Sequence, residues 1–330
     1  MPVGIRCILF AALLALLTGS PGAHADKTAI RYATVDGQRY LFLRDVASYY
    51  GMRYSQAAGS KQIYLTSNYS RLAFTLDERE TTLNGVAVHL GLPVRTWKSN
   101  PVLSNADFQL LLDPILRQQC LPRSNVLRVM IDPGHGGKDP GTKGDRLKQQ
   151  EKAVVLALAG QLRAELTKRG HQVAFTRTSD QTLTLDQRVA AASAWRADVF
   201  ISLHANYVGT PSVRGVESFR MCPKGTTSTY GNSVNSATHR GNACDRRNAR
   251  LAYEVQKALV QATAAPDRGV RQASFLVLRE APCPAVLVEV GYMSNAKEEK
   301  LLAAASYRSK IATGIADGID RFRQAVGQQP

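Results

Sequence analysis

The sequence of 330 residues has no apolar run long enough to cross a membrane. The longest run, residues 7–17, has 11 residues, whereas a transmembrane helix needs roughly 20. Arg6 before this run and Ala23-His24-Ala25 after it are typical of a secretory signal peptide that is cleaved after Ala25. The sequence therefore argues against an integral membrane segment and predicts an exported protein, periplasmic or secreted, beginning at residue 26.

Cysteine is also scarce, and no two cysteines form a C-x-x-C pair. Beyond the predicted signal peptide there are four, Cys120, Cys222, Cys244 and Cys283. This spacing argues against a cysteine-based metal site, but four cysteines in an exported protein allow two disulfides in three connectivities. Cys222 and Cys244 bracket a polar segment, so we consider them a candidate disulfide pair.

Nucleic-acid-binding motifs are absent, and the aromatic residues, 7% of the chain, do not alternate with basic ones. The chain is nevertheless basic, with a formal net charge of +16. Most of the excess lies in residues 125–330, which carry 29 Lys and Arg against 18 Asp and Glu. For an exported protein this charge favours an anionic partner such as cell wall or membrane headgroups, and it argues against nucleic acid.

Residues 26–118 have the pattern of a small α+β domain. Apolar and polar side chains alternate at 30–34, 40–43, 62–66, 72–76 and 86–90, as in half-buried strands, and residues 43–51 predict a short helix. Residues 35–51 read V-D-G-x-x-Y-x-x-L-R-D-V-A-x-Y-Y-G and resemble the copper amine oxidase N-terminal-like domain. The resemblance implies no copper site, because His89 is the only histidine of this half.

A polar segment at 119–125 is the expected linker to a second domain, residues 126–330. Strands and helices alternate there over about 200 residues, which predicts an α/β domain with a mostly parallel sheet flanked by helices. The expected strands are 126–131, 172–176, 198–203, 216–220 and 285–290, and the expected helices are 151–169, 183–195, 248–262 and 306–324.

Three residues with metal-ligand side chains occur where a strand ends or a helix begins. His135 lies in a glycine-rich turn after the first strand, Glu151 begins a helix, and His204 follows the strand 198–203. Because the carboxyl ends of parallel strands meet at one edge of a sheet, the three could converge. Two imidazoles and one carboxylate leave a fourth zinc position open, as in hydrolytic zinc sites.

Each of these residues also has a simpler explanation. The glycine-rich turn could bind phosphate, although it fits no P-loop or dinucleotide pattern. Glu151 suits the first turn of a helix, and His204 could be an ordinary core histidine. Glu289 lies among apolar residues at the end of the strand 285–290, where an unpaired carboxylate is costly. It is therefore either salt-bridged to an arginine or a general acid–base beside the metal.

Seven motifs follow one another along the second domain. They are D-P-G-H-G-G-K-D-P-G at 132–141, E-K at 151–152, T-R at 176–177, A-D-V-F-I-S-L-H-A-N at 197–206, G-V-E-S-F at 215–219, D-R-G-V at 267–270 and P-A-V-L-V-E-V-G-Y-M-S-N at 284–295. With these motifs, residues 126–325 closely resemble the zinc-dependent N-acetylmuramoyl-L-alanine amidases that split septal cell wall. The resemblance implies one Zn²⁺ held by His135, Glu151 and His204, with Glu289 as the catalytic carboxylate.

The implied reaction is cleavage, by zinc-activated water, of the amide between the muramoyl lactyl group and L-alanine, so peptidoglycan is the expected substrate. Asn206 is expected to orient His204, while Glu217 and Arg268 match family positions without an assigned role. The segment 222–244 could be a solvated loop, a rim for anionic muropeptides, or a barrier that a protein activator moves. The alternatives are an exported zinc peptidase and a non-catalytic wall-binding protein.

Overall fold

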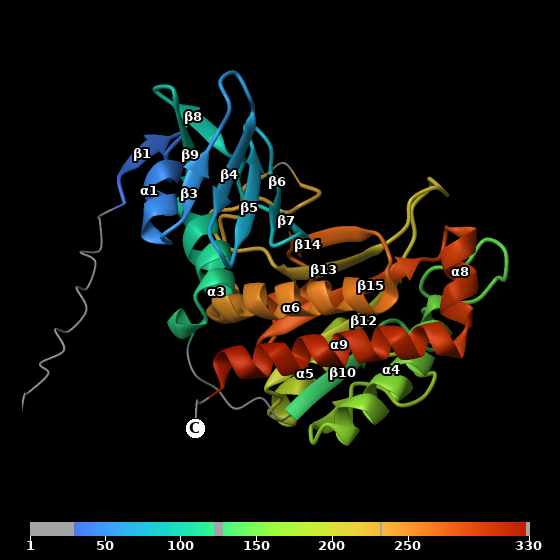
Figure 1. The fold of residues 1–330 in the computed structure, drawn as a ribbon. Helices are drawn as coiled ribbons and strands as arrows, with labels where there is room; N and C mark the ends of the chain where they lie inside the picture. The colour runs from blue at the N-terminus through green and yellow to red at the C-terminus, as the bar shows by residue number, and fades with distance from the viewer. Residues whose placement is uncertain (1–29, 122–127, 232, 328–330) are drawn as a thin grey trace, which may run out of the picture.

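The computed structural model describes residues 30–121, 128–231 and 233–327 (Figure 1). The predicted signal peptide and most of the predicted linker lie outside these residues. No helix within the described ranges is long and apolar enough to span a bilayer.

The N-terminal unit consists of short strands and one short helix, followed by a helical stretch. The five predicted strands and the helix are present, but four further strands, β3, β6, β8 and β9, were not predicted. The elements are β1 Tyr32–Val35, β2 Gln38–Phe42, α1 Leu43–Tyr49, β3 Arg53–Ser55, β4 Gln62–Thr66, β5 Arg71–Thr75, β6 Glu80–Leu83, β7 Val86–His89, β8 Arg95–Trp97, β9 Asn100–Ser104, α2 Asn105–Asp107, a π-helical turn Phe108–Leu112, α3 Asp113–Leu116 and a 3₁₀ turn Gln118–Cys120.

The second unit contains the predicted α/β sheet. The strands β11, β10, β12 and β15 pair in parallel, β13 runs antiparallel to β15, and β14 runs parallel to β13. The mostly parallel sheet is thus confirmed, with β14 as an unpredicted strand. The strands are β10 Arg128–Pro133, β11 Gln172–Phe175, β12 Val199–Asn206, β13 Val216–Met221, β14 Asp267–Ala273 and β15 Ala285–Tyr292.

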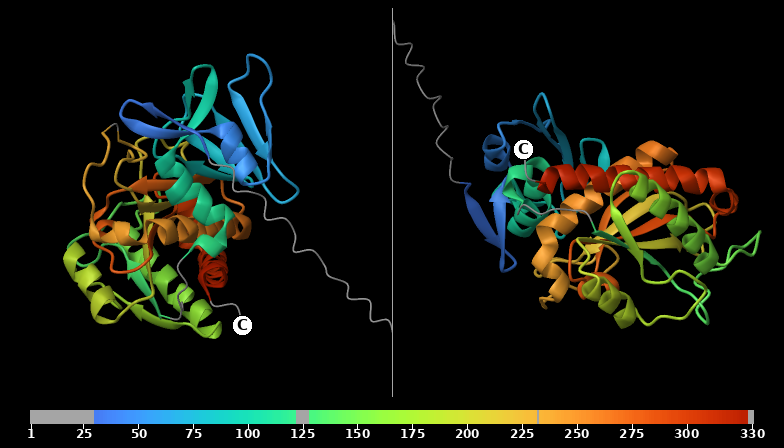
Figure 2. Two further views of the ribbon diagram at one scale, coloured as in Figure 1. Left: turned by 90° about the vertical axis from the view of Figure 1, so that its left-hand side faces the viewer. Right: turned by 90° about the horizontal axis from the view of Figure 1, so that it is seen from below.

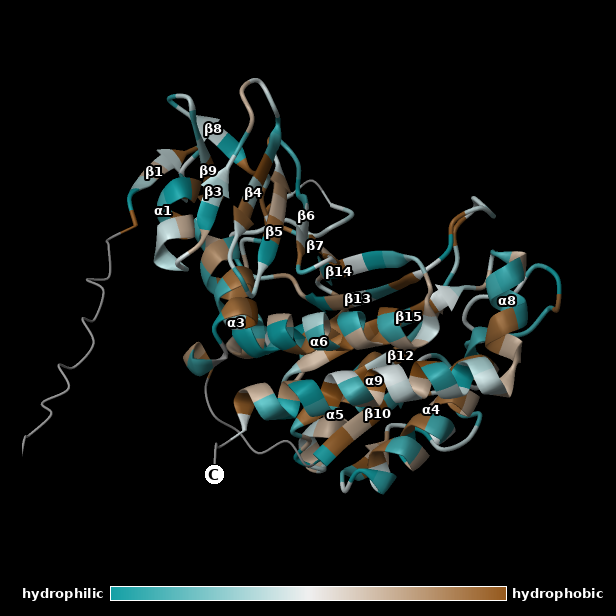
Figure 3. Ribbon diagram, viewed as in Figure 1, coloured by the Kyte–Doolittle hydropathy of each residue, from teal (hydrophilic) through white to brown (hydrophobic). Residues whose placement is uncertain are grey.

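Helices cover both faces of this sheet (Figures 1 and 3). Alternate strand residues such as Ile131, Ile201 and Val288 pack in one core with three long helices, α4 Glu151–Lys168, α6 Asp245–Thr263 and α9 Ala305–Val326. The residues between them, including Phe200 and Leu287, pack against α5 Leu185–Ala194 and α7 Leu276–Arg279. A further helix, α8 Ala296–Ala303, follows β15.

The sheet does not end at β14. Val270 of β14 pairs with Val88 of β7, and the backbone N–H of Ala87 donates to Asp267 Oδ2 at 2.8 Å. One sheet of eleven strands therefore runs through both units, in the order β11-β10-β12-β15-β13-β14-β7-β6-β5-β4-β3. Figure 2 shows the N-terminal strands on the side of the second unit where β14 lies.

All four cysteines beyond the predicted signal peptide are free thiols, so the predicted disulfide between Cys222 and Cys244 is wrong. The Cys222 thiol follows β13 and lies 3.5 Å from Thr226 Oγ1. Cys244 is the last residue of a 3₁₀ turn, Arg240–Cys244, and its thiol lies 3.4 Å from the guanidinium of Arg247. The two sulfur atoms face different neighbours, whereas a disulfide needs their Cβ atoms about 4 Å apart.

Candidate metal centre

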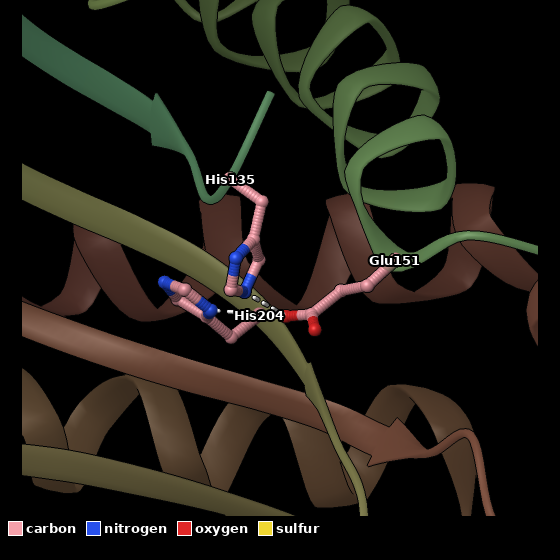
Figure 4. A group of neighbouring side chains, drawn as sticks. All are labelled: His135, Glu151 and His204. Carbon is pink, nitrogen blue, oxygen red and sulfur yellow. Dashed lines mark hydrogen bonds and ion pairs between the residues drawn. The ribbon is translucent and has the colours of Figure 1, made fainter. Parts of the chain in front are cut away.

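The structure brings His135, Glu151 and His204 together at the carboxyl ends of β10 and β12, where α4 begins (Figure 4). One ligand atom from each residue lies within 4.8 Å of the others. Glu151 Oε1 is 3.1 Å from His135 Nε2 and 3.0 Å from His204 Nδ1. The convergence predicted from the strand ends is therefore present.

Two buried arginines hold the turn that carries His135. Arg188 Nη2 donates to the carbonyl of His135 at 2.7 Å, and Arg177 Nη2 donates to the carbonyl of Gly134 at 2.8 Å. Asp132 in turn accepts from Arg188 Nη1 at 2.8 Å. These contacts fix a turn in which His135 has the unfavourable backbone angle φ +60°, as is common at functional sites.

Each of the two imidazoles is positioned by a further neighbour, Asp139 for His135 and Gly134 for His204. Asp139 Oδ2 lies 2.8 Å from His135 Nδ1, so Asp139 orients that ring and leaves Nε2 for a metal. Gly134 passes close under the other ring, since a Cβ atom there would lie 2.6 Å from His204 Nε2. We did not predict the role of Asp139, although it lies four residues after His135 in the glycine-rich motif.

Glu151 is a buried carboxylate that is held ionised. Its Oε1 accepts from the N–H of Ala205 at 3.0 Å, and its Oε2 accepts from the N–H of Thr142 at 2.9 Å. Burial raises the pKa of Glu151, but the hydrogen bonds and charges of His135 and His204 outweigh burial and hold it well below its usual range. A carboxylate that stays charged is a suitable metal ligand.

Glu289 lies beside this cluster. It is paired with His204 across the β12–β15 ladder, and its buried Oε2 makes no hydrogen bond. Burial raises the pKa of Glu289 well above its usual value, and the nearby carboxylates of Glu151 and Glu217 raise it further. Within the described parts of the chain Glu289 forms no salt bridge to an arginine, so the structural explanation for this buried carboxylate is wrong.

A second carboxylate, Glu217, is paired with Glu289 across the β13–β15 ladder and is fully buried. Its Oε1 accepts from Tyr292 Oη at 2.6 Å and from Asn206 Nδ2 at 2.8 Å, and its Oε2 forms an ion pair with Arg271 Nε. The amide of Asn206 donates to Glu217 and accepts from the N–H of Tyr207, so these hydrogen bonds do not support the predicted orientation of His204 by Asn206. Of these residues, Asn206 also borders the site together with Glu289.

Two grooves meet at the cluster. One has an apolar wall, and the other is bordered by polar groups such as Thr142, Asn206 and Tyr207. His135, His204 and Glu289 border both. The apolar wall consists of Leu183, Leu185, Phe275, Leu276, Val277 and Leu287.

The donor set fits a zinc ion. Two imidazole nitrogens and a carboxylate oxygen face a common point, one imidazole is oriented by a second carboxylate, and an unpartnered carboxylate oxygen of Glu289 lies nearby. This arrangement is typical of sites with three protein ligands and one open position.

Comparisons with known proteins agree with this geometry. Residues 129–321 match the family model described as N-acetylmuramoyl-L-alanine amidase. The chain is 34% identical over 217 residues to the N-acetylmuramoyl-L-alanine amidase AmiC of Neisseria meningitidis, covering 59% of this chain but only 52% of that protein. It is 35% identical over 215 residues to AmiA of Salmonella typhimurium, covering 58% of this chain and 74% of the relative.

Solved structures show the same fold. The catalytic domain of CwlV, an N-acetylmuramoyl-L-alanine amidase from Bacillus (Paenibacillus) polymyxa var. colistinus, superimposes with a TM-score of 0.51 at 36% identity. The match covers 61% of this chain and 99% of that domain. The family model spans more than half of this chain, and His135, Glu151 and His204 of the candidate metal centre lie inside the matched range. The chain therefore belongs to the N-acetylmuramoyl-L-alanine amidase family.

Proposed function

We propose that the chain is an exported zinc amidase that hydrolyses the bond between the muramoyl lactyl group and L-alanine in peptidoglycan. The observation that carries this proposal is the convergence of His135, Glu151 and His204 beside the unpartnered Oε2 of Glu289. Membership of the amidase family supports the choice of the bond that is cleaved, and the arrangement of these four side chains supports a hydrolytic metal centre.

His135 Nε2, Glu151 Oε1 and His204 Nδ1 would hold the zinc ion. Zinc, when bound, supplies Lewis acidity that lowers the pKa of water to about 7 and polarises carbonyl oxygens. Glu289 takes the proton of the attacking water at Oε2, an atom free of hydrogen bonds. Its raised pKa then suits it to pass that proton to the leaving amine of L-alanine.

The organisation proposed for the whole protein follows the sequence. Residues 1–25 direct export to the periplasm or the medium, residues 26–118 form the accessory unit that resembles the copper amine oxidase N-terminal-like domain, and residues 126–330 form the catalytic unit. A protein activator is also proposed, because Tyr230 of the segment 222–244 donates to Glu217, the cross-strand neighbour of Glu289, and a partner could move this segment.

The test uses the mature chain, residues 26–330, incubated with purified peptidoglycan with and without a chelator. Mass spectrometry should detect free stem peptides that begin with L-alanine, and the chelator should abolish their release. Glu289→Gln should lower the rate by a factor of about 10² or more. Glu280→Gln, on the loop before β15 and paired with Arg279, is the matched control and should keep the wild-type rate.

Other products would identify the alternatives. Cleavage within the stem peptide would indicate a zinc peptidase. Binding to peptidoglycan with no released peptide, despite one equivalent of bound zinc, would indicate either a wall-binding protein or an enzyme that needs an activator. Adding cell extract to the same assay separates these two.

A further inference from the structure

The segment that follows β13 lies between the N-terminal unit and the active site. We call residues 222–230 the tethered segment. Arg79, in the turn between β5 and β6, donates from Nη2 to the carbonyl of Thr227 at 2.6 Å and from Nη1 to the carbonyl of Ser228 at 3.1 Å. Its Nε donates to the carbonyl of Leu90 at 2.9 Å, which fixes the guanidinium within its own unit. One arginine thus joins the two parts of the molecule through three carbonyl oxygens.

A second contact holds the same segment. The N–H of Thr227 donates to the carbonyl of Gly91 at 3.0 Å, and a Cβ atom at Gly91 would lie only 2.5 Å from the Cβ of Thr226. The backbone at Gly91 therefore packs directly on the tethered segment, and no larger residue fits there without moving it. On its other side, the N–H of Thr229 donates to the carbonyl of Gln272 in β14 at 2.8 Å.

The tethered segment ends at Tyr230, which contacts Glu217, the cross-strand neighbour of Glu289. Its hydroxyl donates to Glu217 Oε2 at 3.1 Å, and its ring lies under the guanidinium of Arg271 at 4.9 Å. Glu217 is paired across the ladder with Glu289. The side chain of Tyr230 is anchored at its hydroxyl, yet the residue is 64% exposed. An exposed aromatic face that is fixed at its far end is suited to contact a substrate.

From these contacts we propose that Arg79 is a positioning residue of the active site, acting through the tethered segment to hold Tyr230 as a substrate-contacting wall beside Glu289. The N-terminal unit is then part of the amidase site. Loss of the contacts between Arg79 and the tethered segment weakens substrate binding more than it slows the chemical step. This inference rests on the proposed amidase function, and its test separates the two.

The first arm measures kinetics on soluble muropeptides. Arg79→Ala should raise KM about 5- to 10-fold with kcat within about 2-fold, and Tyr230→Ala should do the same, because both remove the wall and neither touches the reacting atoms. In the Tyr230→Ala background, Arg79→Ala should have no further effect. Gly91→Ala, which displaces the tethered segment from a second point, should also raise KM. Arg53→Ala, an exposed arginine of the distant strand β3, is the control.

The second arm needs no activity. Hydrogen exchange of peptides covering 226–230 should be at least 10-fold faster in Arg79→Ala than in the wild type or Arg53→Ala, with equal melting temperatures for the two variants. Unchanged exchange, or an Arg79→Ala effect on KM that persists in full without Tyr230, overturns the inference. If even the wild type fails to cleave muropeptides, the proposed function fails, and the exchange measurement alone then decides whether Arg79 holds the segment.

Discussion

At the scale of single residues, His89 shows how closely the N-terminal unit approaches the site. The imidazole is half-buried on β7 and faces the guanidinium groups of Arg271, Arg79 and Arg268. Burial, and with it the positive charges of the three arginines, lowers the pKa of His89 to about 4. The neutral imidazole is therefore the form that the folded protein accepts.

This shift predicts an acid-sensitive fold. An unfolded histidine titrates near 6.5, so the contribution of His89 is fully present above that pH and is lost as the pH falls toward 4. Between pH 7 and pH 5 the free energy of unfolding should fall by about 2 kcal/mol from this residue. His89→Gln should remove that part of the fall, as measured by urea denaturation at both pH values. An identical fall in wild type and variant would contradict the prediction.

Arg188 carries a second prediction at this scale. The guanidinium is buried and pairs with the buried carboxylate of Asp132, and it also donates to the carbonyl of His135. Arg188→Met should cost about 3–5 kcal/mol of stability, because Asp132 is left charged without its partner. It should also weaken zinc binding, since the turn at His135 loses its support. Urea denaturation and zinc titration test both, with the exposed Arg196→Met as the control.

At the scale of elements, the junction of β7 and β14 depends on one side chain. Asp267 Oδ2 accepts from the N–H of Ala87, and Oδ1 accepts from Gln256 Nε2 at 2.7 Å and from the N–H of Gly269 at 2.9 Å. Asp267→Ala should lower the free energy of unfolding by about 2–3 kcal/mol, because it leaves buried donors unpaired. The amide of Ala87 should exchange faster with solvent; an unchanged rate there would show that the strand pairing holds without Asp267.

The elements that the sequence predicts are those with apolar periodicity. The helix α4 and the strand β12 follow from such patterns, and the metal cluster follows because strand ends share one edge of the sheet. β14 was missed because Asp267–Ala273 reads D-R-G-V-R-Q-A, in which charged side chains replace the usual alternation. Two of those side chains, Arg268 and Arg271, face Glu217 instead of a core.

Residues that act through backbone carbonyls were also beyond prediction. Arg188 supports the turn at His135, and Arg79 holds Thr227 and Ser228, in each case through main-chain oxygen atoms. Because every residue has the same backbone carbonyl, the sequence does not indicate which carbonyl an arginine will bind. Asp139 is different, since its spacing from His135 within one motif was a usable signal.

At the scale of the whole molecule, the continuous sheet predicts that the catalytic unit is not independent. A chain reduced to residues 126–330 would expose β14 as an open edge and lose the pairing with Val88. Such edges promote association between chains. We expect a melting temperature lower by about 5 °C or more and concentration-dependent association in sedimentation velocity. A truncated chain as stable and monomeric as the full one would contradict this.

The same sheet constrains the order in which the protein can fold. The strands of the N-terminal unit are synthesised first, but the neighbour of β7 is β14, and Ala87 and Asp267 are 180 residues apart in the chain. During synthesis, the edge of β7 that pairs with β14 therefore stays unpaired until most of the catalytic unit has been made. Pairings of such long range form slowly, so the junction between the units should be the last part of the sheet to close.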